Sequence, residues 1–153
     1  MGRYVIRRHI AAPPEQVFRA FTEPKLVVDW MDAKELRDAT GPLDQPDATY
    51  RLVIFGFHSF RTTVVRSDAA RLHETRGSGR FGWYRMVASL SPRADGTDLE
   101  LLTEYGLPLG PLGRWIDRRW IDREPRAQAN LEVDRLVTLV SQAPALSSGS
   151  PLT

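Results

Sequence analysis

The 153-residue sequence contains no cysteine and only three histidines, His9, His58 and His73. Without cysteine the chain cannot form a disulfide framework, a thiolate zinc site or a cysteine nucleophile. No two of the histidines have the spacing of metal ligands, so we expect no histidine-based metal site. The sequence also has no apolar run of about 18 residues and no apolar signal core near its start. These absences predict a cytoplasmic protein with no stable membrane insertion.

Lysine is scarce as well, because only Lys25 and Lys34 accompany the arginines in a total of 21 basic residues. The 19 acidic residues are interleaved with them almost everywhere, and the formal net charge is only +2. Since no block of like charge stands out, we expect no nucleic-acid partner. Hydrophobic residues make up 42% of the chain, which is enough for a core, and the length predicts a single domain.

Apolar residues alternate in some segments, as in a strand, and recur every three or four residues in others, as in a helix. These two patterns predict the secondary structure of the chain. Residues 2–12 alternate as a strand, with Tyr4, Ile6 and Ile10 on an apolar side that Arg8 interrupts. The remaining expected elements are helices at 15–21 and 24–31 and strands at 33–39, 49–55, 58–67, 71–76, 80–91 and 97–107, with 77–79 as a hairpin connection. The short gaps between these strands favour an antiparallel meander.

The C-terminal part of the chain predicts one long helix followed by a loose tail. Residues 111–140 carry apolar side chains at helical spacing. Because Pro125 removes a backbone hydrogen bond in the middle of this segment, we expect a bend or break within 121–126. Residues 143–153 are rich in proline, serine and glycine and are expected to be flexible.

Several short sequence segments occur in a distinctive order along these elements. They are Ile10-Ala11-Ala12-Pro13-Pro14-Glu15-Gln16-Val17-Phe18, then Thr22-Glu23-Pro24 and Trp30, and near the end Gly96-Thr97-Asp98-Leu99 and Gly110-Pro111-Leu112-Gly113. In these segments and in the order of its elements, the chain resembles the START-like or helix-grip superfamily. The resemblance is to its bacterial polyketide cyclase/dehydrase (SRPBCC) branch and covers roughly residues 2–141.

This resemblance implies an α+β, helix-grip fold, in which a seven-stranded antiparallel curved sheet wraps around a long C-terminal helix. Two short helices lie between strands 1 and 2. The chain would then form a START-like ligand-binding domain at 1–142 and a flexible tail at 143–153. Members of the family keep a deep, mostly apolar cavity between sheet and helix, typically without cofactor or metal. Some fold and aromatise polyketide chains, while others carry, sense or sequester hydrophobic molecules, so the fold alone does not identify the function.

The alternation of the last two strands indicates which side chains face such a cavity. In the last strand the more apolar face carries Leu101, Thr103 and Tyr105, and the Tyr105 phenol is suited to bind a ligand carbonyl. In the strand before it, Tyr84 and Met86 belong to the more continuous apolar face. An ordinary packing role is the alternative for each of these side chains.

Two arginines leave the choice of strand face open. The favoured register puts Arg85 in solvent, whereas the reverse register would bury it beside Trp83 as a binder of carboxylates or enolates. Arg61 stands on a strand where neither face is clearly the more apolar. An exposed Arg61 is favoured, because a buried one would need a carboxylate or an anionic ligand beside it.

The candidates for catalysis are Tyr105, Arg61 and His58, of which His58 stands at a strand start and titrates near neutral pH. His73 and Glu74 are adjacent on a strand and point to opposite faces, so they cannot form an acid–base pair. The residues expected to contact a ligand are Trp30, Tyr84, Met86, Leu101, Thr103, Tyr105, Trp115, Ile116 and Trp120.

Three functions are therefore compared. The first is a carrier or sensor that binds a hydrophobic small molecule, lipid-like or polyketide-like, between sheet and helix. The second is a polyketide aromatase/cyclase or dehydratase that acts in the same cavity by positioning its substrate and moving protons. The third is an interaction module that uses the tryptophan and arginine side chains of the long helix. Binding is favoured because the expected cavity face is poor in polar groups, and the oligomeric state, a dimer included, is left open.

Overall fold

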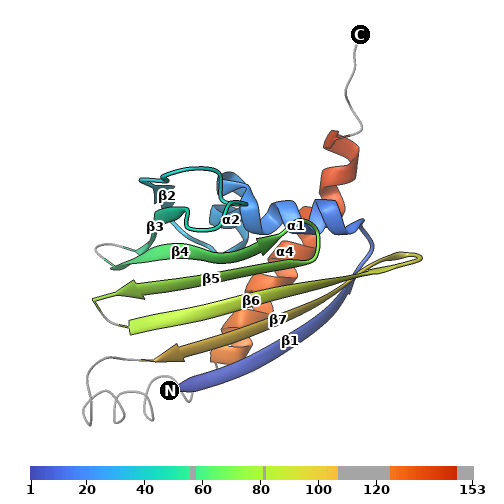
Figure 1. Ribbon diagram of the computed structural model, residues 1–153. Coiled ribbons are helices and arrows are strands. Elements are labelled where there is room, and N and C mark those ends of the chain that lie inside the picture. Colours follow the sequence, from blue (N-terminus) through green and yellow to red (C-terminus); the bar gives the residue numbers. More distant parts are fainter. Residues whose placement is uncertain (56–57, 81, 107–124, 148–153) are drawn as a thin grey trace.

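The computed structural model describes residues 1–55, 58–80, 82–106 and 125–147. Within these ranges the chain forms seven strands and three helices, which are labelled in Figure 1. In chain order they are β1 (Gly2–Ile10), α1 (Pro14–Thr22), α2 (Pro24–Trp30), β2 (Glu35–Arg37), β3 (Thr49–Phe55), β4 (His58–Asp68), β5 (Leu72–Gly79), β6 (Gly82–Arg93), β7 (Gly96–Gly106) and α4 (Pro125–Ser147).

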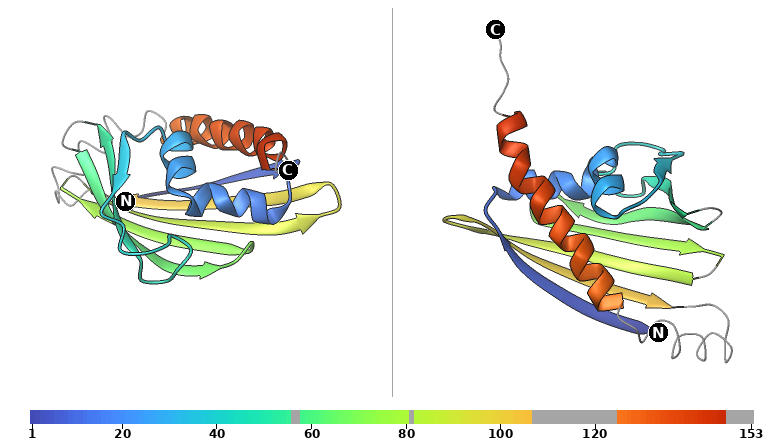
Figure 2. Two further views of the ribbon diagram at one scale, coloured as in Figure 1. Left: turned by 90° about the horizontal axis from the view of Figure 1, so that it is seen from above. Right: turned by 180° about the vertical axis from the view of Figure 1, so that it is seen from behind.

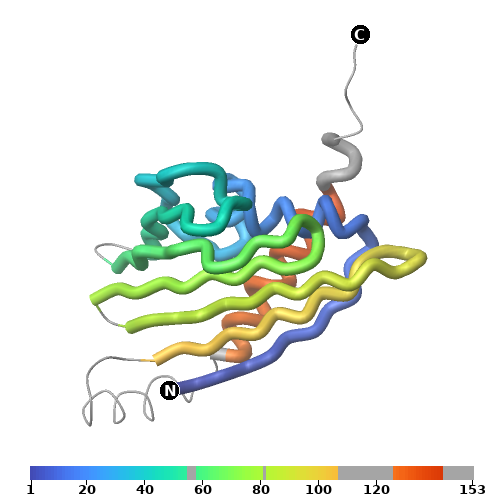
Figure 3. The backbone as a smooth tube through the Cα atoms, in the orientation of Figure 1, coloured from blue at the N-terminus to red at the C-terminus, as the bar shows by residue number. Residues whose placement is uncertain are grey.

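The strands form one antiparallel sheet in the order β1-β7-β6-β5-β4-β3-β2. Strand β1 therefore lies beside β7, although the two are far apart in the sequence (Figure 3). The sheet curves, and α4 crosses its concave side together with α1 and α2 (Figure 2). This arrangement confirms the α+β helix-grip fold expected from the sequence.

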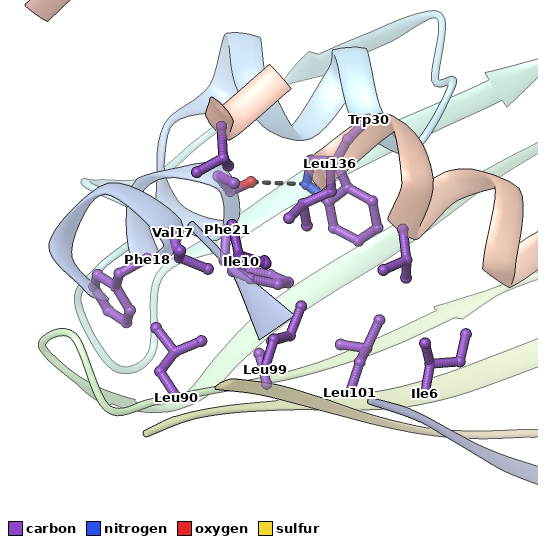
Figure 4. Close-up of a cluster of buried hydrophobic side chains, with 14 of the residues drawn as sticks. Ile6, Ile10, Val17, Phe18, Phe21, Trp30, Leu90, Leu99, Leu101 and Leu136 are labelled. Carbon is purple, nitrogen blue, oxygen red and sulfur yellow. Dashed lines mark hydrogen bonds between the residues drawn. The ribbon is translucent and has the colours of Figure 1, made fainter. Parts of the chain in front are cut away.

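The core lies where α1, α2 and α4 meet the concave face of the sheet. Helix α4 contributes Ala129, Val133, Leu136 and Val140, all at most 4% exposed and spaced to lie along one side of a helix. In Figure 4 the helical side chains face a layer of aliphatic side chains from β1, β6 and β7. Burial of such side chains against water is the main source of the stability of this layer.

Trp30 fixes the two short helices to each other. Its indole is 2% exposed and packs edge-on against Phe21, with 5.4 Å between the ring centroids. Its Nε1 donates a hydrogen bond of 2.8 Å to the carbonyl of Ala20, drawn as the dashed line in Figure 4. Because a buried indole N–H needs a partner, this bond fixes the position of the Trp30 ring at the end of α2.

Arg8 interrupts the apolar side of β1 because it reaches a polar part of α4. Its Nη2 donates a hydrogen bond of 2.7 Å to Oδ1 of Asn130 and lies 3.7 Å from the carboxylate of Asp134. The expected alternation of β1 is therefore correct, with Arg8 on the same side as the buried Ile6 and Ile10.

Several expected boundaries are wrong. Strand β2 covers only Glu35–Arg37 instead of 33–39. Strand β5 continues through Gly77, Ser78 and Gly79, which the sequence predicted to be a connection. The reason is cross-strand pairing, because Gly77 stands directly opposite Tyr84 on β6 and Gly79 opposite Gly82. Glycine is tolerated inside this strand because the ring of Tyr84 covers it.

Helix α4 ends later than the expected helix, and the division into a domain and a flexible tail stays a prediction. The helix continues to Ser147, past the residue at which the flexible tail was expected to begin. Pro144 has no backbone N–H, so it leaves the carbonyl of Val140 without its usual helical donor. Nε2 of Gln16 on α1 donates to this carbonyl at 2.7 Å, which satisfies the acceptor. Most of the segment in which a bend was expected, residues 121–124, lies outside the described residues.

A stability measurement on two glycines tests this packing. A Cβ added at Gly77 would overlap the ring of Tyr84, whereas one at Gly41 meets nothing within 4 Å. We expect Gly77→Ala to lower the free energy of unfolding by about 1–3 kcal/mol and Gly41→Ala to leave it nearly unchanged, as measured by urea unfolding. Equal effects of the two substitutions would contradict the packing of Tyr84 on Gly77.

Candidate functional site

A cavity of about 280 Å³ lies between the concave face of the sheet and α4. Its wall is mainly apolar, and the described residues that line it come from five strands and two helices on opposite sides of the core. Strands β6 and β7 supply the floor, and the first turns of α4 supply the opposite wall. The lining residues are Tyr4, Trp30, Met31, Leu52, Ile54, Phe60, Tyr84, Met86, Leu101, Thr103, Tyr105, Gln128, Ala129 and Glu132.

The floor of the cavity is shaped by one row of directly paired residues that crosses the sheet. From β1 to β3 the row reads Gly2, Tyr105, Tyr84, Gly77, Thr62 and Tyr50. The ring of Tyr105 lies over Gly2, and the ring of Tyr84 lies over Gly77. The two rings therefore lean away from each other, which leaves room between them on the floor.

A hydrogen bond holds the ring of Tyr84 in this position. Its hydroxyl lies 2.7 Å from Oγ1 of Thr62, on the strand beyond Gly77. Burial raises the pKa of Tyr84 to about 12, so the phenol remains neutral at physiological pH. Phe60 packs edge-on against the same ring, with 5.3 Å between the centroids. Tyr84 is thus a fixed part of the wall.

A group of polar side chains lies at one part of the wall, and we call it the polar cluster: Tyr4, Thr103, Tyr105, Gln128 and Glu132. Tyr4 stands directly opposite Thr103, and its ring centroid is 6.1 Å from that of Tyr105. Burial raises the pKa of Tyr4, and the nearby Glu132 raises it further, while a hydrogen bond with Thr103 opposes the shift. These groups offer donors and acceptors inside an otherwise apolar wall.

Glu132 is the one carboxyl group among the described residues that line the cavity. Burial raises its pKa from the ordinary value of 4.5 to about 7, although a hydrogen bond with Gln128 and the charge of Arg135 act in the opposite direction. Arg135 pairs with Asp32 at 3.6 Å, and none of the described cations forms an ion pair with Glu132. The cavity therefore contains an acid that changes its charge near neutral pH.

Six of the residues expected to contact a ligand line the cavity: Trp30, Tyr84, Met86, Leu101, Thr103 and Tyr105. Trp115, Ile116 and Trp120 lie outside the described residues. The structure thus places the predicted faces of β6 and β7 against the cavity. That these side chains bind a ligand stays a prediction.

The structure does not bring the three candidates for catalysis together. Arg61 is exposed on the convex face of the sheet, directly opposite Arg51 on β3 and Ser78 on β5. His58 packs edge-on against Phe60, with 5.2 Å between the ring centroids, and is not among the lining residues. Of the three, only Tyr105 lines the cavity.

Arg85 lies on the convex face, so the favoured register is confirmed. It donates to Glu74 at 2.7 Å and to Glu104 at 3.2 Å. His73, next to Glu74, points to the opposite side and packs edge-on against Phe18. Burial lowers the pKa of His73 to about 4, which keeps its imidazole neutral at physiological pH. As expected, His73 and Glu74 form no pair.

Sequence reasoning missed Tyr4, Gln128 and Glu132. A signal for Glu132 existed, because it stands between Ala129 and Val133 at the border of the apolar stripe of a predicted helix. Helical spacing alone does not show whether such a border residue faces solvent or a cavity.

Among the described residues no group of three or more His, Cys, Asp or Glu side chains is arranged to hold a metal ion. No helix in the described ranges is long and apolar enough to cross a membrane.

A model of the protein family described as "Polyketide cyclase / dehydrase and lipid transport" matches residues 1–140 of the chain. A comparison of the sequence with curated proteins finds no match.

Several solved structures have the same fold. A protein from Mesorhizobium loti is 16% identical with a TM-score of 0.74, and the match covers 92% of this chain and 98% of that one. A protein of unknown function from Staphylococcus aureus is 12% identical with a TM-score of 0.73, over 94% and 96%. DynU16, from the dynemicin biosynthetic locus, is 20% identical with a TM-score of 0.59, over 97% of this chain and 48% of that chain.

The ionisation of Glu132 predicts a pH-dependent effect on stability. Because its folded pKa of about 7 lies above 4.5, stability falls as the pH rises from about 4.5 through about 7. We expect Glu132→Gln to be more stable than the wild type by about 2 kcal/mol near pH 8, since the carboxyl keeps some contact with water and the full shift is not realised. The difference should shrink as the pH falls and vanish at about pH 4, below the unfolded pKa of 4.5, in urea unfolding.

Asp134→Asn is the matched control, because it removes one carboxylate from the exposed side of the same helix. It should not reproduce the gain in stability at the higher pH. If Glu132→Gln has the same effect at both pH values, the raised pKa of Glu132 is wrong.

Proposed function

The chain belongs to the polyketide cyclase / dehydrase and lipid transport family, and from this premise we propose that it binds a hydrophobic small molecule as a carrier or sensor. The ligand would be lipid-like or polyketide-like and would occupy the cavity between the curved sheet and α4. The observation that carries the proposal is the mainly apolar cavity of about 280 Å³, lined from both sides of the core.

The size and wall of the cavity favour a compact guest. Small-molecule sites usually have volumes of about 300–1,000 Å³, and this cavity is slightly smaller than the lower limit of that range. An apolar guest that displaces water from such a wall gains about 25 cal/mol for each Å² removed from water. Met31, Met86 and Ile54 supply this apolar area, and methionine side chains adapt to guests of different shape.

Catalysis in the same cavity is the second candidate, and the polar cluster is the observation that favours it. Glu132, with a pKa of about 7, is suited to donate or accept a proton at physiological pH. Tyr105 adds a phenol that can polarise a carbonyl. Binding remains the preferred proposal, because two of the three candidates for catalysis, His58 and Arg61, are not among the described lining residues.

A pair of alanines on α4 provides a test. Ala129 is 4% exposed and lines the cavity, whereas Ala127 does not line it. The neutral fluorescent probe 1-naphthalenemethanol should bind the wild type, and Ala129→Phe should weaken its affinity by about tenfold or more by filling the cavity. Ala127→Phe should change the affinity little.

Circular dichroism of each variant would establish that it is folded. Native mass spectrometry of the purified wild type should detect an apolar molecule that co-purifies with it. The proposal fails if the probe binds both variants as tightly as it binds the wild type, or if neither this probe nor the related naphthalene probes described below bind at all.

A further inference from the structure

Glu132 points to the chemical class of the guest. We propose that the ligand of this cavity carries a basic nitrogen, and that the carboxylate of Glu132 binds its protonated form. The inference rests on the proposed function, because it concerns the molecule that occupies the same cavity. It adds a specificity-determining residue to a wall that otherwise selects only by shape and hydrophobicity.

The position of Glu132 on α4 is the first argument. It follows Gln128 by one turn, and these two residues line the cavity together with Ala129. An ionised carboxylate offers about four acceptor sites, and the Gln128 amide supplies only one of the donors that it needs. A charged group in apolar surroundings requires further donors or an opposite charge, and a ligand in the cavity can provide both.

The charges around Glu132 are the second argument. Arg135 of α4 and Asp32, just after α2, form an ion pair with each other at 3.6 Å, so the positive charge of Arg135 is already shared. Among the described residues, the phenol of Tyr4 on β1 also interacts electrostatically with Glu132, and the ring of Tyr105 on β7 lies beside that of Tyr4. Within the described ranges, Glu132 and Asp32 against Arg135 leave one uncompensated negative charge, which a guest with a single positive charge would neutralise.

The aromatic side chains of the wall are the third argument. Tyr4, Tyr105 and Trp30 all line the cavity. The faces of such rings attract cations, and the attraction increases when water is excluded. Since the indole N–H of Trp30 already donates to the carbonyl of Ala20, this residue offers no hydrogen-bond donor to a guest. Aromatic surfaces and one carboxylate together form a site that suits an organic ammonium group.

The same features disfavour an acidic guest. A fatty acid or another carboxylate would bring a second negative charge next to Glu132, and like charges in a poorly hydrated site repel each other. Among the described residues that line the cavity there is no lysine, arginine or histidine to offset that repulsion. A neutral alcohol can still donate one hydrogen bond to Glu132, but it brings no charge.

Three probes that share one ring system test this specificity on the full chain: 1-naphthylmethylamine, 1-naphthalenemethanol and 1-naphthoic acid. Their dissociation constants near about pH 8 would be measured by fluorescence titration. Since a hydrogen bond to a charged group contributes more than a neutral one, we expect the amine to bind about tenfold or more tighter than the alcohol. The acid should bind most weakly.

The pH dependence identifies the residue involved. The amine stays protonated between about pH 6 and about pH 8, whereas Glu132, with a pKa of about 7, loses its charge toward the lower value. The affinity for the amine should therefore fall several-fold on acidification, while that for the alcohol changes little. Glu132→Gln should abolish both the preference for the amine and its pH dependence, and Asp134→Asn should retain them.

The outcomes separate this inference from the proposed function. If alcohol and amine bind equally well to the wild type, the inference is overturned and the proposed function stands. If none of the three probes binds, the proposed function fails and the inference fails with it. The comparison of probes on the wild type at two pH values needs no variant, so it decides the question even if Glu132→Gln does not fold.

Discussion

The cavity depends on the contact of two tyrosine rings with two glycines on neighbouring strands. Tyr105 lies over Gly2 and Tyr84 over Gly77, in one row of paired residues. Any larger residue at either glycine would push the ring above it toward the middle of the floor. The strongly curved sheet alone would not keep this space open, because flexible side chains would fill it. The glycines therefore shape the cavity indirectly, because they determine where the two rings lie.

A buried and a half-buried glutamate show how the environment sets the charge state of a carboxyl group. Glu74 is 3% exposed on the convex face, where Arg85 at 2.7 Å and Arg76 at 3.6 Å compensate its charge. Glu132 has no such cation within the described part of the chain, and burial raises its pKa to about 7. A buried charge that the fold leaves without a partner lowers stability, and such groups are concentrated at binding and catalytic sites.

Much of the fold could be predicted from local patterns. The alternation in β7 identified Leu101, Thr103 and Tyr105 as one face, and the pairing with β1 and β6 placed that face against the cavity. The errors occurred where pairing overrides local preference. Residues 77–79 have the composition of a turn, yet they belong to β5 because they pair with residues of β6. The helix was also expected to end at 140, but α4 continues to Ser147, and Gln16 satisfies the carbonyl that Pro144 leaves free.

What the sequence by itself determined is the order of the elements and the faces of the best-alternating strands, because both follow from periods of two and 3.6 residues. Only the tertiary structure decided which polar groups meet. Tyr4, Thr103 and Glu132 are far apart in the sequence. They line one cavity because β1 pairs with β7 and α4 crosses both strands. The spacing of residues along the chain does not predict this proximity, because the proximity depends on how the sheet curves and on where the helix crosses it.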